Sequence, residues 1–334
     1  MAFDLVFIWA GLIAFAVLTY VILDGFDLGV GVLFATSKSE YERDMMMNSV
    51  APVWDGNETW LVLGGGGLFA VFPLAYAIVM PALYMPITLM LLALVFRGGA
   101  FEYRWRTRRW KPVWDWAFTV GSTIAAFCQG IALGALVQGI EIKGRAYAGG
   151  WWDWLTPFSI VTGLAVVTGY ALLGATWLNL KTEGELQIRM RRFAWWLGMA
   201  TLVFIAVVSI LTPFQDPVYF QRWFELPSGL YSAAVPILVA LAAWRLFLGL
   251  NDQKELQPFV AALALFVLSF VGIGISFYPM MVPPSLTIWQ AAAPDNSLAF
   301  ALVGTLVLVP LILGYTAYAY WVFRGKVDPA GGYH

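Results

Sequence analysis

Two pairs of carboxylates stand beside long apolar segments in the first part of the sequence. Asp24 and Asp27 lie three residues apart, as do Asp55 and Glu58. Residues three apart share one face of a helix, so each pair can act together. Buried carboxylates can both accept and release a proton near neutral pH, because burial raises their pKa. The pairs therefore predict a proton relay. The alternative is that they mark helix ends near the lipid headgroups.

Other charged residues interrupt the apolar runs that follow. Arg97 precedes two glycines and can pair with an acidic side chain or an anionic cofactor group, or extend to the headgroups. Glu102 comes five residues later, and Asp115 opens the next apolar run. These groups are concentrated in roughly the first 115 residues, so we expect the functional site there.

Glycines accompany the carboxylates at helical spacing. Gly25 and Gly29 are four residues apart, and Gly65 belongs to a run of four consecutive glycines. Small residues allow helix backbones to approach closely in a membrane, so we expect these three positions at helix contacts. No Lys-Ser or Lys-Thr follows the glycine run, which argues against a phosphate-binding loop.

Composition indicates the elements that must position these residues. The 334 residues are 61% hydrophobic and only 12% charged. Long apolar runs without alternation predict an all-α, polytopic transmembrane helical bundle that forms a single domain over residues 1–334. We expect two four-helix bundles plus one peripheral helix. The nine expected spans are residues 5–34, 59–77, 81–99, 113–140, 154–180, 193–212, 228–250, 259–281 and 297–323.

The distribution of charge predicts the orientation. All but three of the 19 basic residues lie at or after the ends of odd-numbered spans, which places the N-terminus outside and the C-terminus in the cytoplasm. Five basic residues between Arg104 and Lys111 suit this topology and contact with anionic lipid. The net charge of -1 gives no indication of a nucleic-acid partner.

The scarcity of metal ligands is also informative. The only histidine is His334 and the only cysteine is Cys128, so no intramolecular disulfide can form. One terminal imidazole cannot ligate several haems or a metal cluster. We therefore expect no metal or haem to be ligated by this chain.

Two stretches resemble the hallmark motifs of subunit II of cytochrome bd-type quinol oxidases. Residues 24–31, DGFDLGVG, are similar to the family's DGFD-x-G-x-G, and residues 48–60 are similar to its NS-x-A-P-x-WDGNE-x-W. Arg97, the run Glu102-Tyr103-Arg104 and the run Trp114-Asp115-Trp116 resemble further family positions in the same order.

The resemblance implies a haem-free subunit II of a membrane quinol:dioxygen oxidoreductase, a terminal oxidase of the bacterial cytoplasmic (inner) membrane. Its partner, subunit I, carries two b haems, one d haem and the quinol-binding loop. The complex reduces dioxygen to water with protons from the cytoplasm, and no catalytic residue is expected in subunit II. In this family, carboxylates of subunit II are proposed to line a hydrophilic path toward haem d. The matching positions are Asp55 and Glu102, with Asp24, Asp27, Arg97 and Asp115 nearby.

Several alternatives stay open at this point. The resemblance does not decide between ubiquinol and menaquinol, and it leaves open the cyanide-insensitive subtype, a small accessory transmembrane subunit and a structural quinone or lipid bound to this chain. Two other functions compete with a proton path: a secondary transporter with intramembrane carboxylates, and a purely structural subunit. The charged groups cluster at one side of the early spans and not at the midplane of matched halves, which disfavours the transporter.

Overall fold

The computed structural model describes residues 4–226 and 228–328. The elements are α1 (Leu5–Phe34), α2 (Glu40–Asn48), α3 (Trp54–Val71), α4 (Pro73–Ala82), α5 (Tyr84–Tyr103), α6 (Lys111–Gln138), β1 (Ile142–Lys143), β2 (Ala146–Tyr147), α7 (Pro157–Lys181), α8 (Gly184–Leu211), η1 (Thr212–Phe214), α9 (Pro217–Phe224), α10 (Ser228–Asn251), α11 (Leu256–Phe277), β3 (Met280–Val282), β4 (Leu286–Thr287), α12 (Ile288–Ala291) and α13 (Asp295–Val322). Within the described ranges, eight helices are long and apolar enough to cross a membrane: α1, α5, α6, α7, α8, α10, α11 and α13. The chain is therefore a multi-pass membrane protein.

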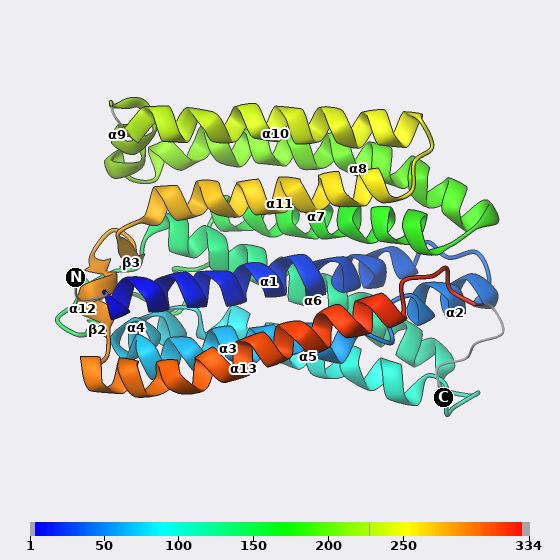
Figure 1. Ribbon diagram of the computed structural model, residues 1–334, viewed down its shortest axis with the longest axis horizontal. Helices are drawn as coiled ribbons and strands as arrows, with labels where there is room; N and C mark the ends of the chain where they lie inside the picture. Colours follow the sequence, from blue (N-terminus) through cyan, green and yellow to red (C-terminus); the bar gives the residue numbers. More distant parts are fainter. Residues whose placement is uncertain (1–3, 227, 329–334) are drawn as a thin grey trace.

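The expected span at residues 59–77 is divided between two helices. α3 ends at Val71, and Phe72 leaves the helical conformation (φ -124°, ψ 59°) before Pro73 begins α4. A proline disfavours helical geometry in the residue before it, which explains the break. The four consecutive glycines do not interrupt α3, which is continuous across them. α3, α4 and α5 together form a hairpin whose turn is the short helix α4 (Figure 1).

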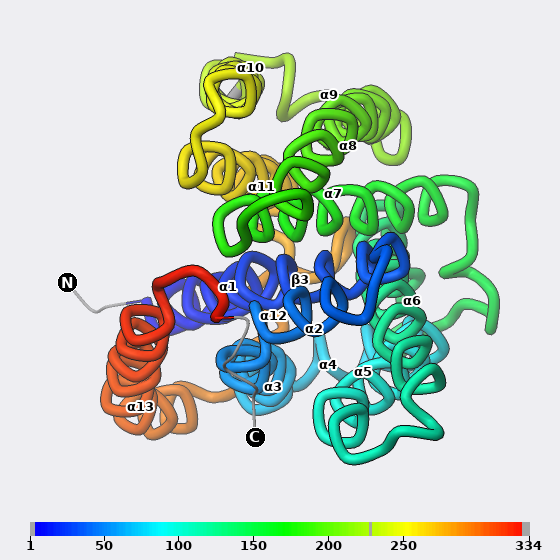
Figure 2. Tube along the Cα trace, turned by 90° about the vertical axis from the view of Figure 1, so that its right-hand side faces the viewer, coloured from blue at the N-terminus to red at the C-terminus, as the bar shows by residue number. Residues whose placement is uncertain are grey.

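The long helices lie side by side around α1, which packs against α3, α6 and α7. Seen along the bundle, α7, α8, α10 and α11 lie on one side of α1, and α3, α5 and α6 lie on the other (Figure 2). α13 lies at the edge, beside α1 and α3. α1 begins at one end of the bundle and α13 ends at the opposite end, where α2 also lies (Figure 1). We call the latter the α2 end.

Two short hairpins add β-structure to the helical fold that the sequence predicts. β1 pairs antiparallel with β2, and β3 pairs antiparallel with β4. Both hairpins lie in loops at the end of the bundle opposite α2 (Figure 1). They connect helices and do not form a layer of the core.

Close packing of α1 against α7 depends on glycine. A Cβ on Gly29 would lie 1.7 Å from the carbonyl oxygen of Tyr170, and one on Gly174 would lie 2.3 Å from the backbone of Gly29. A Cβ on Gly25 would lie 2.8 Å from the ring of Tyr170. These positions therefore let the two backbones approach, as small residues do in membrane bundles.

Gly65 differs from these positions. A Cβ added there would meet no atom within 4 Å among the residues that the structure describes. Among the described residues, therefore, Gly65 has no helix contact of the kind expected of it. In the same glycine run Gly67 does face a neighbouring helix, since its Cβ would lie 2.5 Å from Cδ1 of Ile13 on α1.

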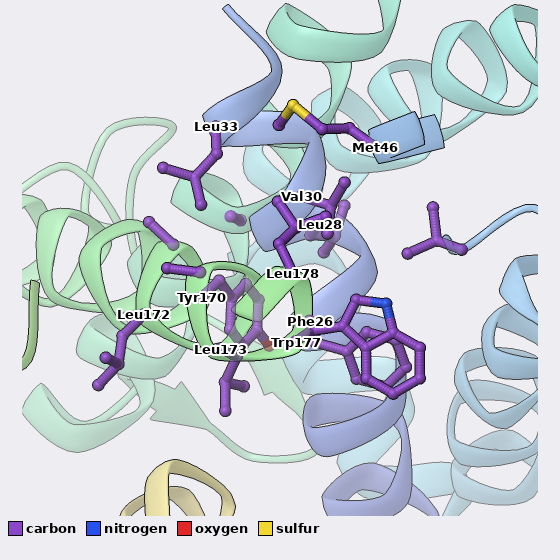
Figure 3. Packing of buried hydrophobic residues seen from close by; sticks show 14 of the residues in the cluster. Phe26, Leu28, Val30, Leu33, Met46, Tyr170, Leu172, Leu173, Trp177 and Leu178 are labelled. Carbon is purple, nitrogen blue, oxygen red and sulfur yellow. The ribbon is translucent and has the colours of Figure 1, made fainter. Parts of the chain in front are cut away.

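Large side chains fill the space around the glycine contact. Phe26 on α1 stacks on Trp177 on α7, with ring centroids 4.3 Å apart and an interplanar angle of 26°. Leu28 and Val30 of α1 and Leu173 of α7 belong to the same buried cluster (Figure 3). Because lipid is as apolar as these side chains, the association of the helices is stabilised by dense van der Waals contact more than by the removal of apolar surface from water.

An ion pair fixes α2 to α8. Arg189 donates from Nη1 to Glu42 Oε1 at 3.0 Å and from Nη2 to Oε2 at 2.6 Å. The backbone N–H of Lys38 also donates to Oε2 of this carboxylate, at 2.6 Å. These hydrogen bonds, with the one from Arg189 the largest cause, hold the pKa of Glu42 below its usual value of 4.5.

Candidate functional site

Arg97 on α5 lies among three carboxylates from two other helices. Its Nη1 donates to Glu58 Oε1 on α3 at 2.7 Å. Its Nη2 lies 3.0 Å from Asp24 Oδ1 and 3.9 Å from Asp27 Oδ2, both on α1. The side chains of Arg97, Asp24 and Asp27 are at most 1% exposed, whereas that of Glu58 is 23% exposed. We call these four side chains the Arg97 cluster.

Helix geometry explains how these residues meet. Asp24 and Asp27 share a face of α1, which packs against α3 and so against Glu58. Arg97 is not at a helix end, because α5 continues beyond the two following glycines to Tyr103. Its side chain is therefore inside the bundle, and the alternative that it extends to the headgroups is wrong.

The charges of the Arg97 cluster do not balance if every group is ionised. One guanidinium faces three carboxylates. Oδ1 of Asp24 has Arg97 as its ion-pair partner, whereas Oδ2 of Asp24 and Oδ1 of Asp27 are buried without a hydrogen bond from the described residues. Buried carboxylates without a full set of partners are costly as anions, so this arrangement suits groups that hold protons.

Two residues without an expected role complete one side of the cluster. Asn57 on α3 is buried and donates from Nδ2 to Asp27 Oδ2 at 2.7 Å. The hydroxyl of Tyr320 on α13 donates to Asn57 Oδ1 at 3.0 Å. Asn57 belongs to the WDGNE stretch of the sequence, which could have indicated it. For Tyr320, 263 residues away, the sequence carries no such signal.

A second set of polar side chains continues from Asp24 toward the middle of α1. Tyr20 lies one helical turn before Asp24 and accepts a hydrogen bond from Nε2 of Gln129 on α6 at 2.9 Å. The hydroxyl of Tyr170 on α7 donates to Oε1 of the same glutamine at 2.7 Å. Gln129 therefore joins α1, α6 and α7 in the buried interior.

Asp55 and Glu102 lie outside the Arg97 cluster. Asp55 is exposed in the first turn of α3, three residues before Glu58, and has no hydrogen bond or ion pair within the described chain. The side chain of Glu102 is 55% exposed, and among the described residues it pairs only with Arg106, at 3.4 Å. Five residues after Arg97 correspond to about 500° of helix rotation, so Glu102 points to another face of α5.

Asp115 belongs to a separate network at the α2 end. It accepts from Nε of the fully buried Arg104 at 2.5 Å and from Nη1 of Arg43 at 3.3 Å. Arg104 also donates to Asp44 on α2 at 2.6 Å. This network, which we call the α2-end belt, also includes the ion pair of Lys111 with Glu40. It joins α2 to the end of α5 and the start of α6, and it does not include Arg97.

The side chains of the described residues that could ligate a metal do not gather at one place to hold a metal ion. Met45, Met46 and Met47, whose sulfurs could serve as axial ligands, are buried in the apolar core. Between residues 4 and 328, residue 227 aside, no group of three or more His, Cys, Asp or Glu side chains is placed to hold a metal ion. The single histidine, His334, lies outside the described residues.

The fold and the Arg97 cluster define a multi-pass membrane protein with a charged site inside its helical bundle. Residues 5–323 match the family described as cytochrome bd terminal oxidase subunit II, and the chain belongs to that family. Membership implies a subunit I partner in a haem-containing oxidase complex, and it separates the chain from secondary transporters.

Individual relatives agree with this assignment. The chain is 32% identical over 358 residues to the cytochrome bd-I ubiquinol oxidase subunit 2 of Escherichia coli (strain K12), covering 96% of this chain and 94% of that protein. It is 30% identical over 336 residues to the cytochrome bd ubiquinol oxidase subunit 2 of Bacillus subtilis (strain 168), with 96% of each covered. The structure of the bd oxidase from Geobacillus thermodenitrificans matches with a TM-score of 0.80 and 16% identity, over 96% of this chain and 99% of that one. At that identity the structural match concerns the fold.

Proposed function

We propose that this chain, as subunit II of a cytochrome bd-type terminal oxidase, takes up protons at the α2 end and passes them through the Arg97 cluster toward subunit I. The complex transfers electrons from quinol to dioxygen, and the reduction of dioxygen to water consumes protons. In this account the two b haems and the d haem belong to subunit I. This chain supplies a route for protons and no catalytic residue.

The observation that carries the proposal is the contact of the buried Arg97 with three carboxylates, of which Glu58 is partly exposed and Asp24 and Asp27 are buried. A fourth carboxylate, that of Asp55, does not contact Arg97 and is exposed. Asp55 and Glu58 lie three residues apart on α3 and share a face. A proton taken up at Asp55 can therefore reach Glu58 and then the buried pair without leaving the polar side chains.

The charge of the cluster supports proton storage. With all three carboxylates ionised, the Arg97 cluster would carry two uncompensated negative charges inside the bundle. Uncompensated buried charges are strongly unfavourable, because a low-dielectric interior does not screen them. The resting cluster therefore holds protons on its carboxylates. Release of one toward subunit I leaves a negative charge that a proton from the Asp55 side can neutralise.

We further propose that the α2 end faces the cytoplasm and that α3 is a ninth membrane crossing. Most basic residues lie at the α2 end, as the positive-inside rule requires of the cytoplasmic side. α3 has 18 residues, which at 1.5 Å per residue span about 27 Å, close to the hydrocarbon thickness of about 30 Å. This gives an outside N-terminus, two four-helix bundles (α1, α3, α5, α6 and α7, α8, α10, α11) and a peripheral α13 in the bacterial cytoplasmic membrane.

Glu102 enters this account only through the complex. It is exposed on α5 and has no contact with the Arg97 cluster in this chain. We therefore assign it to the proton path on the condition that subunit I covers it. The exposed position of Asp55 needs no such condition, since uptake from the cytoplasm requires contact with water.

A structural role is the second candidate, because the same ion pairs join α1, α3 and α5. The two roles differ in what an exposed carboxylate does. Asp55 contributes no ion pair to the bundle, so its replacement should leave the assembled complex intact in either case. Only the proton path predicts a loss of turnover.

The test is Asp55→Asn in the purified complex, compared with Asp252→Asn. Asp252 is an exposed aspartate at the end of α10, also at the α2 end. We expect Asp55→Asn to lower quinol oxidase turnover while the haem content stays at the parental level, and Asp252→Asn to change neither. Parental turnover in Asp55→Asn would show that Asp55 takes no part in proton uptake and that protons enter elsewhere.

A further inference from the structure

A recess at the α2 end shares no residue with the Arg97 cluster. It lies between the end of α5 and the start of α6 and has a volume of about 380 Å³. Its lining consists of Tyr103, Arg106, Thr107, Trp110, Val113 and Trp114. The recess therefore combines an apolar, mainly aromatic wall with a basic side chain.

Positive charge at this recess is in excess. Arg108 and Arg109 are exposed, and within the described ranges no carboxylate lies within 4.0 Å of either. The side chain of Arg106 is 74% exposed and its one ion pair, with Glu102, spans 3.4 Å. The other two basic residues of this loop are already paired in the α2-end belt. The exposed guanidinium groups of Arg106, Arg108 and Arg109 can therefore bind an anion.

Arg109 contacts one of the residues that line the recess. The guanidinium of Arg109 lies over the ring of Trp110, 5.5 Å from its centroid. This cation–π contact restricts the side chain while leaving its N–H groups free to donate. Trp110 is itself 57% exposed and lines the recess. The positive charge thus stands beside an apolar surface.

The apolar wall continues away from the charges along α6. Val113, Trp116 and Val120 are 53%, 66% and 42% exposed, and their spacing of three and four residues places them on one face of the helix. α6 is a membrane-crossing helix, so this stripe runs from the recess toward the bilayer interior. A ligand that fits both parts needs an anionic group and a long apolar chain.

We propose that this recess binds an anionic phospholipid, with the phosphate between Arg106 and Arg109 and one acyl chain along Val113, Trp116 and Val120. A soluble phosphate would use the arginines but leave the aromatic wall in water. Tryptophan at the membrane interface and basic clusters on the cytoplasmic side are both typical of lipid contact. The site is independent of the Arg97 cluster, so it stands whether or not that cluster conducts protons.

The test measures lipid binding to the intact oxidase complex after detergent removal of its native lipids. Phosphatidylglycerol, phosphatidylcholine and inorganic phosphate are each added, and bound molecules are counted by native mass spectrometry. We expect phosphatidylglycerol to bind more tightly than phosphatidylcholine. The double substitution Arg106→Gln and Arg109→Gln should weaken phosphatidylglycerol binding about 30-fold, since each basic side chain near a membrane surface raises the affinity by a factor of about five to six.

Two further variants make the test specific. Arg245→Gln also removes an arginine that stacks on an exposed tryptophan, Trp244, and should leave binding unchanged. Trp110→Ala removes part of the apolar wall without changing charge and should weaken phosphatidylglycerol binding too. The proposal is overturned if the arginine double variant binds phosphatidylglycerol like the parent. It is also overturned if inorganic phosphate competes equally well, which would make the ligand a free phosphate.

Discussion

The guanidinium of Arg97 lies 3.0 Å from the carboxylate of Asp24, and both side chains are at most 1% exposed. Removing one partner of such a pair leaves the other charge buried without compensation, which typically costs about 3–5 kcal/mol. We therefore expect Arg97→Gln to lower the melting temperature of the purified complex strongly, or to reduce assembly with subunit I.

A double-mutant cycle separates the charge effect from loss of packing. Asp24→Asn in the Arg97→Gln background removes one of the stranded carboxylates, so the double variant should recover part of the lost stability. Additive losses in melting temperature would show that Arg97 and Asp24 do not stabilise each other. The ion pair between them would then contribute nothing to the stability of the complex.

Glycine substitutions test the contact between α1 and α7. Gly29→Ala places a methyl group 1.7 Å from a backbone oxygen, so the helices must separate. Overpacking of this kind costs about 1–3 kcal/mol or more. We expect a clear fall in the melting temperature of the complex and a loss of haem-containing assembly.

Gly65→Ala is the matched control, because the added methyl group meets nothing within 4 Å in the described part of this chain. Alanine is favoured over glycine inside a helix by about 0.5–1 kcal/mol, so stability should be unchanged or slightly higher. A loss equal to that of Gly29→Ala would indicate that subunit I packs against Gly65.

The Glu42–Arg189 pair predicts a pH dependence of stability. Hydrogen bonding to Arg189 holds the pKa of Glu42 below 4.5 in the folded state. A carboxylate with a lowered folded-state pKa stabilises the fold above its unfolded pKa, and this contribution is lost as pH falls through the folded-state value. The melting temperatures of parent and Glu42→Gln should therefore differ most at neutral pH and converge below pH 4.5. A constant difference across this range would contradict the assignment.

Tyr320 offers a test of how α13 is attached. Tyr320→Phe removes the donor to Asn57 Oδ1 and leaves that oxygen without its partner in the interior, which costs about 1–3 kcal/mol. Tyr318→Phe is the control, because Tyr318 is 62% exposed on the same helix. We expect only Tyr320→Phe to lower the melting temperature. Equal effects of the two substitutions would mean that the hydrogen bond to Asn57 adds nothing.

The carboxylate pairs could be predicted from the sequence because their spacing determines which helix face they share. Asp24 and Asp27 need only a helix to act together, and α1 is continuous through both. Arg97 could not be placed in the same way. Its role depends on where α5 ends, and the two glycines after it are equally compatible with a helix end and with a helix that continues to Tyr103.

Contacts over long separations were beyond prediction from a single sequence. Asn57 and Tyr320 are 263 residues apart, and their hydrogen bond depends on how α13 packs beside α3. Asp115 shows the same limit, since its partner Arg104 lies across a loop whose path local propensity does not determine. The membrane class and the family were both accessible from composition and motifs.

The central claim is that the Arg97 cluster passes protons, and Glu58 is the residue that tests it most directly, because it joins the exposed side to the buried pair. The measurement is the quinol oxidase turnover of the purified complex carrying Glu58→Gln, with haem content as the check on assembly. Glu185→Gln, at an exposed glutamate in the first turn of α8, is the control. The account predicts a fall of about 100-fold with haem content intact, the scale on which positioned proton-transfer groups act. Parental turnover in Glu58→Gln, with haem intact, would contradict the account.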